Sequence, residues 1–412
     1  MSKQMLIVGG GQAGARAAQT LRSKGWQDQI TIICKEDHLP YERPPLSKDV
    51  LLNGRKTQDC LVHQPDFYVE QGINLHLATE VLRIDRLAHR VELSTGEELP
   101  YHRLLLAMGA KPRRLSTPGA ERSNVVYLRT AADAMNLSQR LSPGVRCVII
   151  GGGLIGLEVA ASARGLGCDV CVVEAAPQLL TRAVPKQLSA RLHARHTEAG
   201  VKFYLAAQVA RLEGSGAETM VKLTDGAQLG CDIVIAGIGA SPNTELASEC
   251  GLSVEDGVLV DPTLQTEDPA IYVAGDACRY FDPVLNSYVR QETWKSAEEQ
   301  GRLAAGNMLG AHEPYSATPW FWSHQYELTL QVAGAPARGT RTVERPGDGD
   351  SLILFHLFED GRVAGVSSVA IGTAASKDMR IGQMLIEQQI KPDPVALVES
   401  KNLKSFLQTA VH

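Results

Sequence analysis

Short runs of apolar and β-branched residues alternate with longer helical stretches over the first two thirds of the chain. Two of these runs, residues 4–8 and 146–150, lead into a glycine-rich turn, a helical stretch and a second apolar run, at residues 30–34 and 170–173. Strands that alternate with helices in this way are typical of parallel α/β layers. The pattern therefore predicts an α/β protein that contains two copies of one β-α-β unit.

The pattern changes after about residue 326. Apolar and polar positions alternate over residues 328–332, 352–358 and 363–369, which indicates antiparallel strands, and helical stretches follow residue 374. Earlier in the chain, strand-like runs at residues 104–109 and 271–276 lie on either side of the second β-α-β unit. We therefore predict three domains: a split amino-terminal domain of residues 1–112 and 243–316, an inserted domain of residues 113–242, and a carboxyl-terminal α+β domain of residues 317–412.

The composition narrows the class of protein. The 412 residues include 44% hydrophobic and 21% charged side chains, which is ordinary for a protein with packed cores. A net charge of −5 excludes a general attraction to nucleic acid or to an anionic membrane. We find no uncharged run of about 18 residues that could cross a bilayer, and no segment of the signal-peptide type. The eight cysteines are scattered along the chain, which favours a reducing cytoplasm over a disulfide framework.

Each glycine turn follows the pattern G-x-G-x-x-G, as GGGQAG at residues 9–14 and GGGLIG at residues 151–156. In a dinucleotide-binding turn the first glycine permits the bend, the second lets a pyrophosphate approach the backbone, and the third lets helix and strand pack closely. A glutamate follows the next strand in both copies, where its carboxylate can accept hydrogen bonds from a ribose. A tight turn without a ligand is the alternative, which the occurrence of two copies in one context disfavours. The residues expected at the two sites are Gly9, Gly11, Ala13, Gly14 and Glu36, and Gly151, Gly153, Ile155, Gly156 and Glu174.

Two dinucleotide sites in one chain are typical of enzymes that hold a flavin and exchange a nicotinamide. The run at residues 271–276 ends in Gly275 and Asp276, and can bring a carboxylate to the ribityl hydroxyls of FAD. We therefore expect bound FAD at the first site and exchanging NADH at the second. No basic residue follows Glu174 directly, which favours NADH over NADPH, and Arg182 is the nearest base that could contribute to this site.

Several further motifs are more specific. They are LPYERPPLSK at residues 39–48, YLRT at 127–130, GLE at 156–158, GIG at 237–239 with PN at 242–243, GD at 275–276, ETW at 292–294 and PWFWS at 319–323. With them the whole chain resembles the NADH-dependent ferredoxin reductases of bacterial oxygenase systems, of the putidaredoxin reductase and aromatic-ring dioxygenase type. The resemblance implies a glutathione-reductase-like flavoprotein with two dinucleotide-binding domains and a carboxyl-terminal α+β domain.

The resemblance also assigns roles to individual residues. It implies that Lys48 approaches the flavin and pairs with Glu158 at the nicotinamide entrance; a surface ion pair of little energetic value is the alternative. Lys35 precedes Glu36 where the family has an Asp-Glu pair, so Glu36 is expected to make the ribose contact alone. The other implied contacts are, to FAD, Arg43, Val81, Arg129, Asp276 and Trp294, and, to NAD, Gly239.

The reaction that the resemblance implies starts with hydride transfer from NADH to FAD. It ends with single-electron transfer to a [2Fe–2S] ferredoxin that feeds a Rieske dioxygenase or a cytochrome P450, as in aromatic hydrocarbon catabolism. The alternatives are an NADH oxidase or a small-molecule or rubredoxin reductase of the same fold, and a flavin-bearing interaction protein in which redox activity is secondary.

Ferredoxins are generally acidic, so we expect a docking face that is basic locally although the chain is acidic overall. Trp320 and Trp322 are expected to cover the flavin and to meet the partner; the alternative is that they belong to the core of the third domain. The basic candidates are Arg279, Arg290, Lys295 and Arg302, of which Arg302 is the preferred docking residue.

Two patterns are set aside. Cys168 and Cys171 form a C-x-x-C, but they lie on an expected strand, where residues three apart point to opposite faces and cannot easily form a redox pair. His193 and His196 have helical spacing, but two imidazoles without further ligands are expected to be a solvated surface pair. We predict no metal site.

Overall fold

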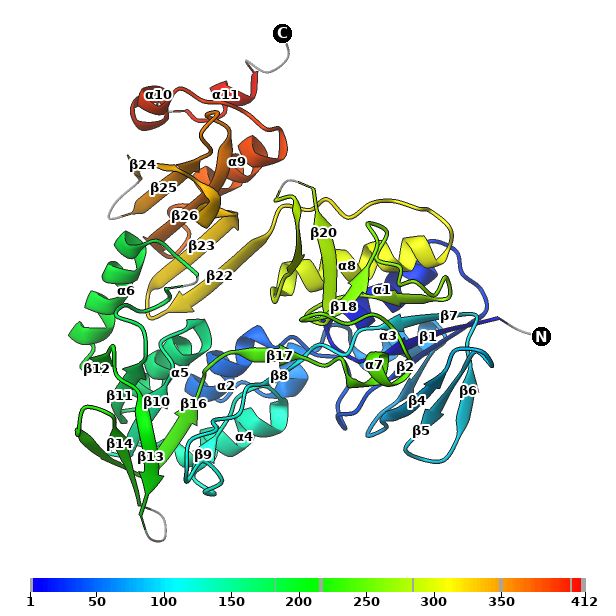
Figure 1. Ribbon diagram of the computed structural model, residues 1–412, viewed down its shortest axis with the longest axis horizontal. Coiled ribbons are helices and arrows are strands. Elements are labelled where there is room, and N and C mark those ends of the chain that lie inside the picture. The colour runs from blue at the N-terminus through cyan, green and yellow to red at the C-terminus, as the bar shows by residue number, and fades with distance from the viewer. Residues whose placement is uncertain are drawn as a thin grey trace. The chain divides into compact units, whose positions relative to one another are not determined.

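The computed structural model describes residues 3–181, 183–214, 218–283, 285–347, 351–400 and 402–408. The chain divides into two units, and each is made of segments that are far apart in the sequence (Figure 1). Unit 1 consists of Met1–Pro44, Lys56–Lys111 and Ala240–Ala317, and unit 2 consists of Pro45–Arg55, Pro112–Gly239 and Thr318–His412.

Unit 1 is built on a five-stranded parallel sheet with the order β19-β7-β1-β2-β3. The central strand β1 is buried along its whole length, because helices cover a parallel sheet on both faces. Helix α8 packs directly on α1, and a Cβ at Gly301 of α8 would overlap the carbonyl oxygen of Ala13. The elements are β1 (Gln4–Val8), α1 (Gln12–Ser23), β2 (Gln29–Ile33), β3 (Ile73–His76), β7 (Arg103–Leu106), β19 (Ile271–Val273) and α8 (Trp294–Met308).

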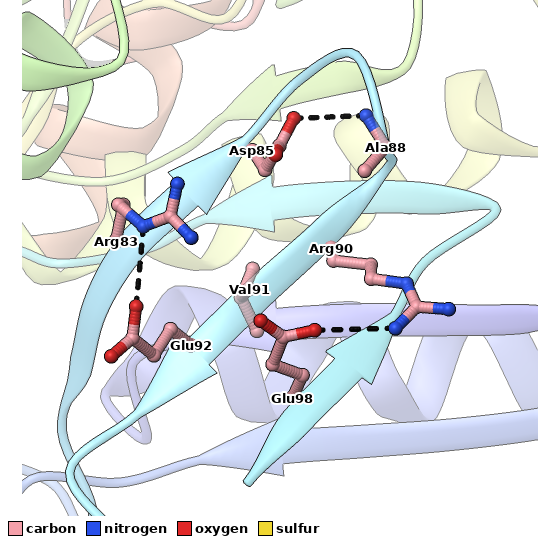
Figure 2. A pocket seen from close by; sticks show the side chains of 7 residues that line it. All are labelled: Arg83, Asp85, Ala88, Arg90, Val91, Glu92 and Glu98. Atoms are coloured by element: carbon pink, nitrogen blue, oxygen red, sulfur yellow. Dashed lines mark hydrogen bonds and ion pairs between the residues drawn. The ribbon is translucent and has the colours of Figure 1, made fainter. Parts of the chain in front are cut away.

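A small antiparallel sheet of β4, β5 and β6 is inserted between β3 and β7 in the sequence. Ion pairs connect its strands, Arg83 with Glu92 and Arg90 with Glu98, and these side chains line a shallow hollow on its surface (Figure 2). The strands are β4 (Val81–Asp85), β5 (Arg90–Leu93) and β6 (Glu98–Pro100).

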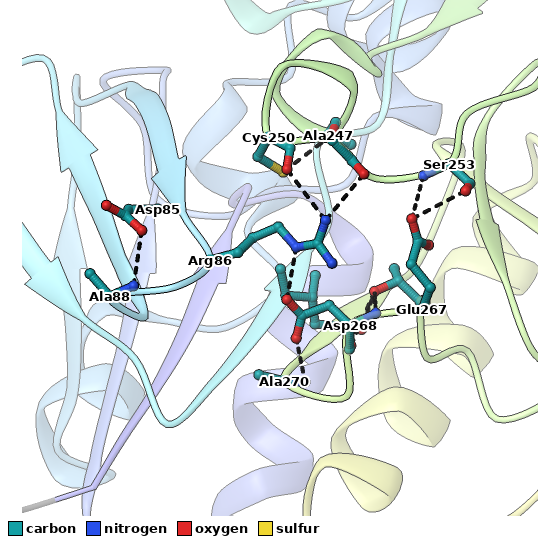
Figure 3. Close-up of polar contacts among 12 residues, drawn as sticks. Asp85, Arg86, Ala88, Ala247, Cys250, Ser253, Glu267, Asp268 and Ala270 are labelled. Carbon is teal, nitrogen blue, oxygen red and sulfur yellow. Dashed lines mark hydrogen bonds and ion pairs between the residues drawn. The ribbon is translucent and has the colours of Figure 1, made fainter.

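One arginine joins this small sheet to the segment that returns after residue 239. In the turn between β4 and β5, Arg86 donates from Nε to Asp268 Oδ2 at 2.8 Å and from Nη1 to the carbonyl oxygen of Gly251 at 3.1 Å (Figure 3). A charged group with several fixed acceptors is held more firmly than a single surface ion pair. The contact therefore ties the two distant parts of unit 1 together. The segment after residue 239 also forms a three-stranded sheet, in which β20 pairs parallel with β18 and antiparallel with β21. The strands are β18 (Val258–Val260), β20 (Cys278–Asp282) and β21 (Ser287–Arg290).

Unit 2 repeats this plan. Its parallel sheet has the order β12-β11-β10-β16-β9, and a second small antiparallel sheet, β13-β14-β15, is inserted between β12 and β16 in the sequence. The internal repeat therefore includes the small sheet as well as the glycine turn, and extends beyond the β-α-β unit predicted from the sequence. The elements are β9 (Val125–Val126), α4 (Ala131–Arg140), β10 (Arg146–Ile150), α5 (Leu154–Gly165), β11 (Asp169–Glu174), α6 (Lys186–Glu198), β12 (Lys202–Leu205), β13 (Val209–Glu213), β14 (Thr219–Leu223), β15 (Gln228–Cys231) and β16 (Ile233–Ala236).

Unit 2 also contains the carboxyl-terminal part of the chain, an antiparallel sheet with the order β22-β23-β26-β25-β24. Helix α9 packs on this sheet, and strand β26 lies beside α6 (Figure 1). The predicted α/β fold with a carboxyl-terminal α+β part is confirmed, although β22 and β24 were not predicted. The elements are β22 (Trp320–Gln325), β23 (Leu328–Gly334), β24 (Arg341–Pro346), β25 (Leu352–Leu357), β26 (Val363–Ile371), α9 (Ser376–Glu387), α10 (Pro394–Glu399) and α11 (Ser405–Gln408). Within the described ranges, every helix is too short or too polar to span a bilayer.

Candidate dinucleotide sites and a buried carboxylate

The first glycine turn connects β1 to α1 in a conformation that only glycine permits. Gly9 has a φ of +117°, and a Cβ there would overlap the carbonyl oxygen of Ala107, which follows β7. A Cβ at Gly14 would overlap the carbonyl oxygen of Gly9. Gly11 is the N-cap of α1 and brings no side chain to the cap, and a Cβ there would meet nothing within 4 Å. The first N–H groups of α1 are therefore open to an anion.

The second turn has the same geometry. Gly151 has a φ of +111°, and a Cβ there would overlap the carbonyl oxygen of Gly237, which follows β16. A Cβ at Gly156 would overlap the carbonyl oxygen of Gly151, and the N-cap Gly153 again has open space beside it. The two predicted phosphate-binding turns therefore have equivalent structures. Each packs against the backbone that follows a strand paired with the central strand, β7 in unit 1 and β16 in unit 2.

The glutamate that follows β2 is part of a charged cluster in unit 1. Glu36 accepts from the Tyr41 hydroxyl at 2.6 Å and from Arg43 Nη2 at 2.7 Å. Burial alone would raise the pKa of Glu36, but Arg43 and Tyr41 outweigh it, so the pKa lies below its ordinary value. Burial alone would lower the pKa of Arg43, but Tyr41, Glu36 and Asp276 outweigh it and raise that pKa. The structure thus brings together three of the residues predicted for the flavin, which are Glu36, Arg43 and Asp276.

The glutamate that ends β11 has different partners. Glu174 accepts from two backbone N–H groups, that of Gly152 at 2.6 Å and that of Ala176 at 2.7 Å. It therefore connects the glycine turn to the end of the next strand without a cation in either bond. Arg182, the base that we expected nearby, lies outside the described residues.

The residues around the first turn fit a bound dinucleotide. Gln12, in the first turn of α1, is buried, and neither its Oε1 nor its Nε2 has a hydrogen-bond partner. Gln300 of α8 accepts from the Gly275 N–H at 2.8 Å, but its buried Nε2 has no partner. Buried polar atoms are rarely left without partners in a folded protein. Donors and acceptors gathered beside an open helix N-terminus match the phosphates and hydroxyls of a flavin dinucleotide.

A buried carboxylate is the centre of the predicted catalytic pair. Glu158, on α5, is only 4% exposed. It accepts from Lys48 Nζ at 3.0 Å, from Ser323 Oγ at 2.7 Å and from the Ser47 hydroxyl. The expected contact between Lys48 and Glu158 is present, and the alternative of a surface ion pair is wrong, because the lysine is also mostly buried.

Ser47 and Lys48 belong to a short excursion of the chain, residues 45–55, that is part of unit 2. The Ser162 hydroxyl of α5 donates to the carbonyl oxygen of Ser47 at 2.7 Å, and Leu51 lies in the apolar core around β10. The excursion contains α2 (Asp49–Leu52), which packs against both α4 and α5. Ser47 and Ser323 were not predicted as site residues, although each lies in a motif that carried the family resemblance.

The remaining predicted cofactor residues are distributed between the two units. In unit 1, Val81 is buried at the start of β4, and Trp294 is the first residue of α8. In unit 2, the Arg129 N–H donates to Asp133 at the start of α4, and the carbonyl oxygen of Gly239 accepts from the Arg113 N–H.

The predicted basic docking residues are all paired with acids. The ion pairs are Arg279 with Glu255, Arg290 with Asp256 and Glu292, Lys295 with Glu299, and Arg302 with Glu298. These carboxylates offset the local excess of positive charge that motivated the prediction. Arg302 has the most exposed side chain of the four basic residues, at 54%. Trp320 and Trp322 stack on one face of β22, with ring centroids 5.1 Å apart and an interplanar angle of 23°.

One prediction about the histidines is wrong. His196 is fully buried, because α6 packs on the carboxyl-terminal sheet, and its Nε2 lies 2.9 Å from Gln325 Oε1. His193 is half-buried, with its ring against Phe203. Cys168 and Cys171 are both free thiols. Among the described residues, no group of three or more possible ligands could hold a metal ion.

The profiles of two known protein families match the chain. The profile of the pyridine nucleotide-disulphide oxidoreductases matches residues 3–301, and the profile of the reductase C-terminal domain matches residues 320–407. The chain therefore belongs to the pyridine nucleotide-disulphide oxidoreductase family. Membership of this family implies that the chain binds FAD and NAD(H).

The most informative relatives are electron-transfer components of oxygenase systems. The ferredoxin–NAD(+) reductase component of the anthranilate 1,2-dioxygenase system of Burkholderia cepacia is 40% identical over 405 residues, which cover 98% of each chain. Putidaredoxin reductase of Pseudomonas putida is 35% identical and covers 98% of this chain and 97% of its own. The crystal structure of the covalent putidaredoxin reductase–putidaredoxin complex matches with a TM-score of 0.93, 34% identity and 99% coverage of both chains. The predicted membership of the ferredoxin reductases of bacterial oxygenase systems is confirmed.

Proposed function

We propose that this protein oxidises NADH and reduces a [2Fe–2S] ferredoxin that feeds an oxygenase, by way of a bound FAD. The observation that carries the proposal is the pair of equivalent glycine turns in one chain whose full-length relatives are ferredoxin reductases. When bound, FAD supplies the conversion between a two-electron hydride donor and a one-electron acceptor.

FAD binds at the turn of unit 1 and NADH at the turn of unit 2. Ala13, in the first turn of α1, is 5% exposed because α8 and Gly275 lie against it. Ile155, the corresponding residue of α5, is 48% exposed. An enclosed turn suits a cofactor that stays bound, whereas an open turn suits a nucleotide that enters and leaves in each cycle.

The chain's own residues hold the two dinucleotides. N–H groups at the start of α1 and α5 bind the pyrophosphates, which the positive end of each helix dipole also attracts. Glu36 and Glu174 accept hydrogen bonds from ribose hydroxyls, and the neutral partners of Glu174 favour NADH over NADPH. The other residues that we assign to FAD are Gly9, Gly11, Gly14, Arg43, Lys48, Val81, Arg129, Asp276 and Trp294, and those that we assign to NADH are Gly151, Gly153, Gly156, Arg182 and Gly239.

Lys48 and Glu158 act at the point of hydride transfer. The Lys48 ammonium supplies positive charge that favours the reduced flavin, and Glu158 holds the ammonium in place through a bond of 3.0 Å. Glu158 is itself kept in position by two serine hydroxyls. This arrangement orients the Lys48 ammonium and keeps water away from the Glu158 carboxylate.

The ferredoxin docks through Arg302, Trp320 and Trp322, and the protein acts in the cytoplasm. In unit 1, the exposure of the Arg302 side chain supports its role. In unit 2, Trp322 stacks on Trp320, which also packs against the apolar core of the carboxyl-terminal sheet. We further propose the domain division given by the sequence: residues 1–112 with 243–316 for FAD, 113–242 for NADH, and 317–412 for the carboxyl-terminal domain.

The direct test is to purify the protein, identify its flavin, and compare NADH with NADPH in the reduction of a panel of ferredoxins, a rubredoxin and oxygen. We expect one FAD per chain, faster turnover with NADH, and turnover with at least one ferredoxin. Fast reduction of oxygen or rubredoxin without ferredoxin turnover would contradict the proposal. The docking surface is tested by R302E, which is expected to raise the KM for ferredoxin but not that for a small dye. K391E reverses another ion-paired surface charge of similar exposure, 59%, and serves as the control.

A further inference from the structure

A line of buried polar side chains runs from Glu158 through β22 to α6. Ser323 Oγ lies 2.7 Å from Glu158 Oε1, Gln325 Nε2 lies 3.1 Å from Ser323 Oγ, and His196 Nε2 lies 2.9 Å from Gln325 Oε1. The Tyr326 hydroxyl, 3.3 Å from His196 Nδ1, ends the line. All of these groups belong to unit 2, and the first four residues are buried.

The direction of every hydrogen bond in this line follows from the carboxylate. An ionised carboxylate only accepts, so the one hydroxyl proton of Ser323 points at Glu158. Ser323 Oγ must then accept from the Gln325 amide nitrogen, which turns the amide oxygen toward His196. An amide oxygen also only accepts, so His196 carries its proton on Nε2. His196 Nδ1 is then an acceptor, and the Tyr326 hydroxyl donates to it.

The surroundings keep His196 and Tyr326, the last two groups of the line, in the neutral form that this order requires. Burial lowers the pKa of His196 to about 4 and raises the pKa of Tyr326 to about 12, so both are neutral near pH 7. Arg195 of α6 makes two bonds to Glu327, at 2.7 and 3.0 Å, and its guanidinium lies 4.2 Å from the centre of the Tyr326 ring. The turn between β22 and β23 is therefore held on α6, and the line is held with it.

Strand β22 presents different side chains on its two faces. Ser323 and Gln325 lie on the face that contacts Glu158 and His196, whereas Trp320 and Trp322 lie on the other face, because successive residues of a strand point to opposite sides. The strand that carries the proposed docking tryptophans therefore also supports the proposed catalytic carboxylate.

We propose that Ser323, Gln325 and His196 are positioning residues for hydride transfer, which hold the Glu158 carboxylate correctly oriented through one-way hydrogen bonds. This inference rests on the proposed function for the role of Glu158. The hydrogen-bond order rests only on the contacts given above.

The tautomer of His196 tests the hydrogen-bond order independently of turnover. In the flavin-loaded protein labelled with ¹⁵N-histidine, NMR is expected to show His196 as the neutral Nε2–H form. In E158Q the new amide can donate to Ser323, so the order is no longer imposed and the Nδ1–H form becomes populated. A wild-type His196 in the Nδ1–H or doubly protonated form, or a tautomer that is unchanged in E158Q, would overturn the inference.

Kinetics test the positioning role. Q325L removes the link between His196 and Ser323, and is expected to lower the limiting rate of flavin reduction by NADH about tenfold while the KM for NADH is unchanged, the size expected for weakening a hydrogen bond to a charged group. S323A, which removes the direct bond to Glu158, is expected to have at least the same effect and serves if Q325L does not fold.

The matched control is S367A. It removes another buried histidine contact in the same sheet, between His356 Nε2 and Ser367 Oγ at 2.9 Å, and is expected to lower the melting temperature without changing flavin reduction. Equal losses in S367A and Q325L, or no loss in Q325L and S323A, would overturn the positioning role. If E158Q itself reduces flavin at the wild-type rate, the proposed role of Glu158 fails instead, while the tautomer result still decides the hydrogen-bond order.

Discussion

The two glycine turns have nearly the same backbone but different surroundings. Their N-cap residues, Gly11 and Gly153, have φ of −83° and −82° and ψ of −170° and −177°. In unit 1 the following helix is covered by α8 through the close approach at Gly301, whereas the first turn of α5 exposes Ile155. Under the proposed function, the turn itself recognises a dinucleotide, whereas the elements packed against it determine whether the dinucleotide stays bound or exchanges.

The two acidic residues differ in the same sense. Glu36 is held by Arg43 and Tyr41 in a charged cluster, whereas the hydrogen-bond donors to Glu174 among the described residues are backbone N–H groups. A charged cluster assembled around one site favours a cofactor that is part of the folded structure. Under the proposed function, the cluster around Glu36 belongs to the bound FAD, and the carboxylate of Glu174 belongs to the exchanging NADH.

The largest expected effect comes from placing a methyl group in either turn. G14A and G156A each force a Cβ onto a carbonyl oxygen of their own turn, at a cost of about 3 kcal/mol, the upper end for overpacking. We expect G14A to be purified without flavin, whereas G156A keeps its flavin but loses NADH binding. Absorbance at the flavin band and a titration with NAD⁺ measure the two losses. Loss of flavin in G156A but not in G14A would reverse the assignment.

A smaller effect is expected from G301A, which pushes α8 away from the start of α1 that it covers. The added Cβ overlaps the Ala13 carbonyl oxygen, so we expect the free energy of unfolding to fall by about 2 kcal/mol and flavin to dissociate on dilution. NADH binding should be unchanged. G306A lies on the same helix, where a Cβ meets only the Lys24 side chain at ordinary distance, and is the control. Equal flavin loss in both variants would contradict the role of the close approach.

The charged cluster predicts a pH dependence. Because the pKa of Glu36 lies below its ordinary value of 4.5 in the folded chain, its ionisation stabilises the fold above that pH, and the contribution is lost as the pH falls through the folded-state pKa. R43Q is therefore expected to cost about 1 kcal/mol at pH 7, and the difference from wild type should shrink below pH 4.5. Thermal unfolding at saturating FAD measures it. R83Q, which removes an exposed ion pair, should differ little from wild type at any pH.

The smallest effect is expected at the second carboxylate. E174Q keeps the shape of the side chain, but its amide nitrogen cannot accept a hydrogen bond, so one of the two backbone N–H bonds is lost. We expect kcat/KM for NADH to fall less than tenfold while that for NADPH changes little. The ratio of the two specificity constants, measured with a ferredoxin as acceptor, checks this. A larger loss with NADPH than with NADH would contradict the assigned ribose contact.

The order of apolar residues and glycines in the sequence correctly predicted the elements whose bounds are set by neighbouring residues. The bounds of β1 and β10 agree with the sequence prediction, because each is an apolar run that ends at a glycine required by the turn. Strand β22 was missed because aromatic residues occupy both of its faces, so no alternation of polar and apolar residues marks it. The small sheets were missed because their pairing is set by cross-strand contacts rather than by a motif.

The candidate site shows the same division. The glycine turns and glutamates could be predicted, since each motif contains its own geometric reason. His196 could have been placed correctly from its spacing, because it follows Leu188 and Leu192 on the buried stripe of α6. Its partner Gln325 lies 129 residues away, so nothing local indicates their hydrogen bond.

The excursion at residues 45–55 determines which segments of this chain can be exchanged with those of related proteins. It leaves unit 1 in sequence but is fastened to α5 by Ser47 and by the Leu51 side chain. A chimera in which only the segment between about residues 111 and 240 is exchanged would combine Lys48 of one parent with Glu158 of the other. Unit 2 is therefore discontinuous in the sequence, and a graft that keeps the contact between Lys48 and Glu158 within one parental chain must carry both segments.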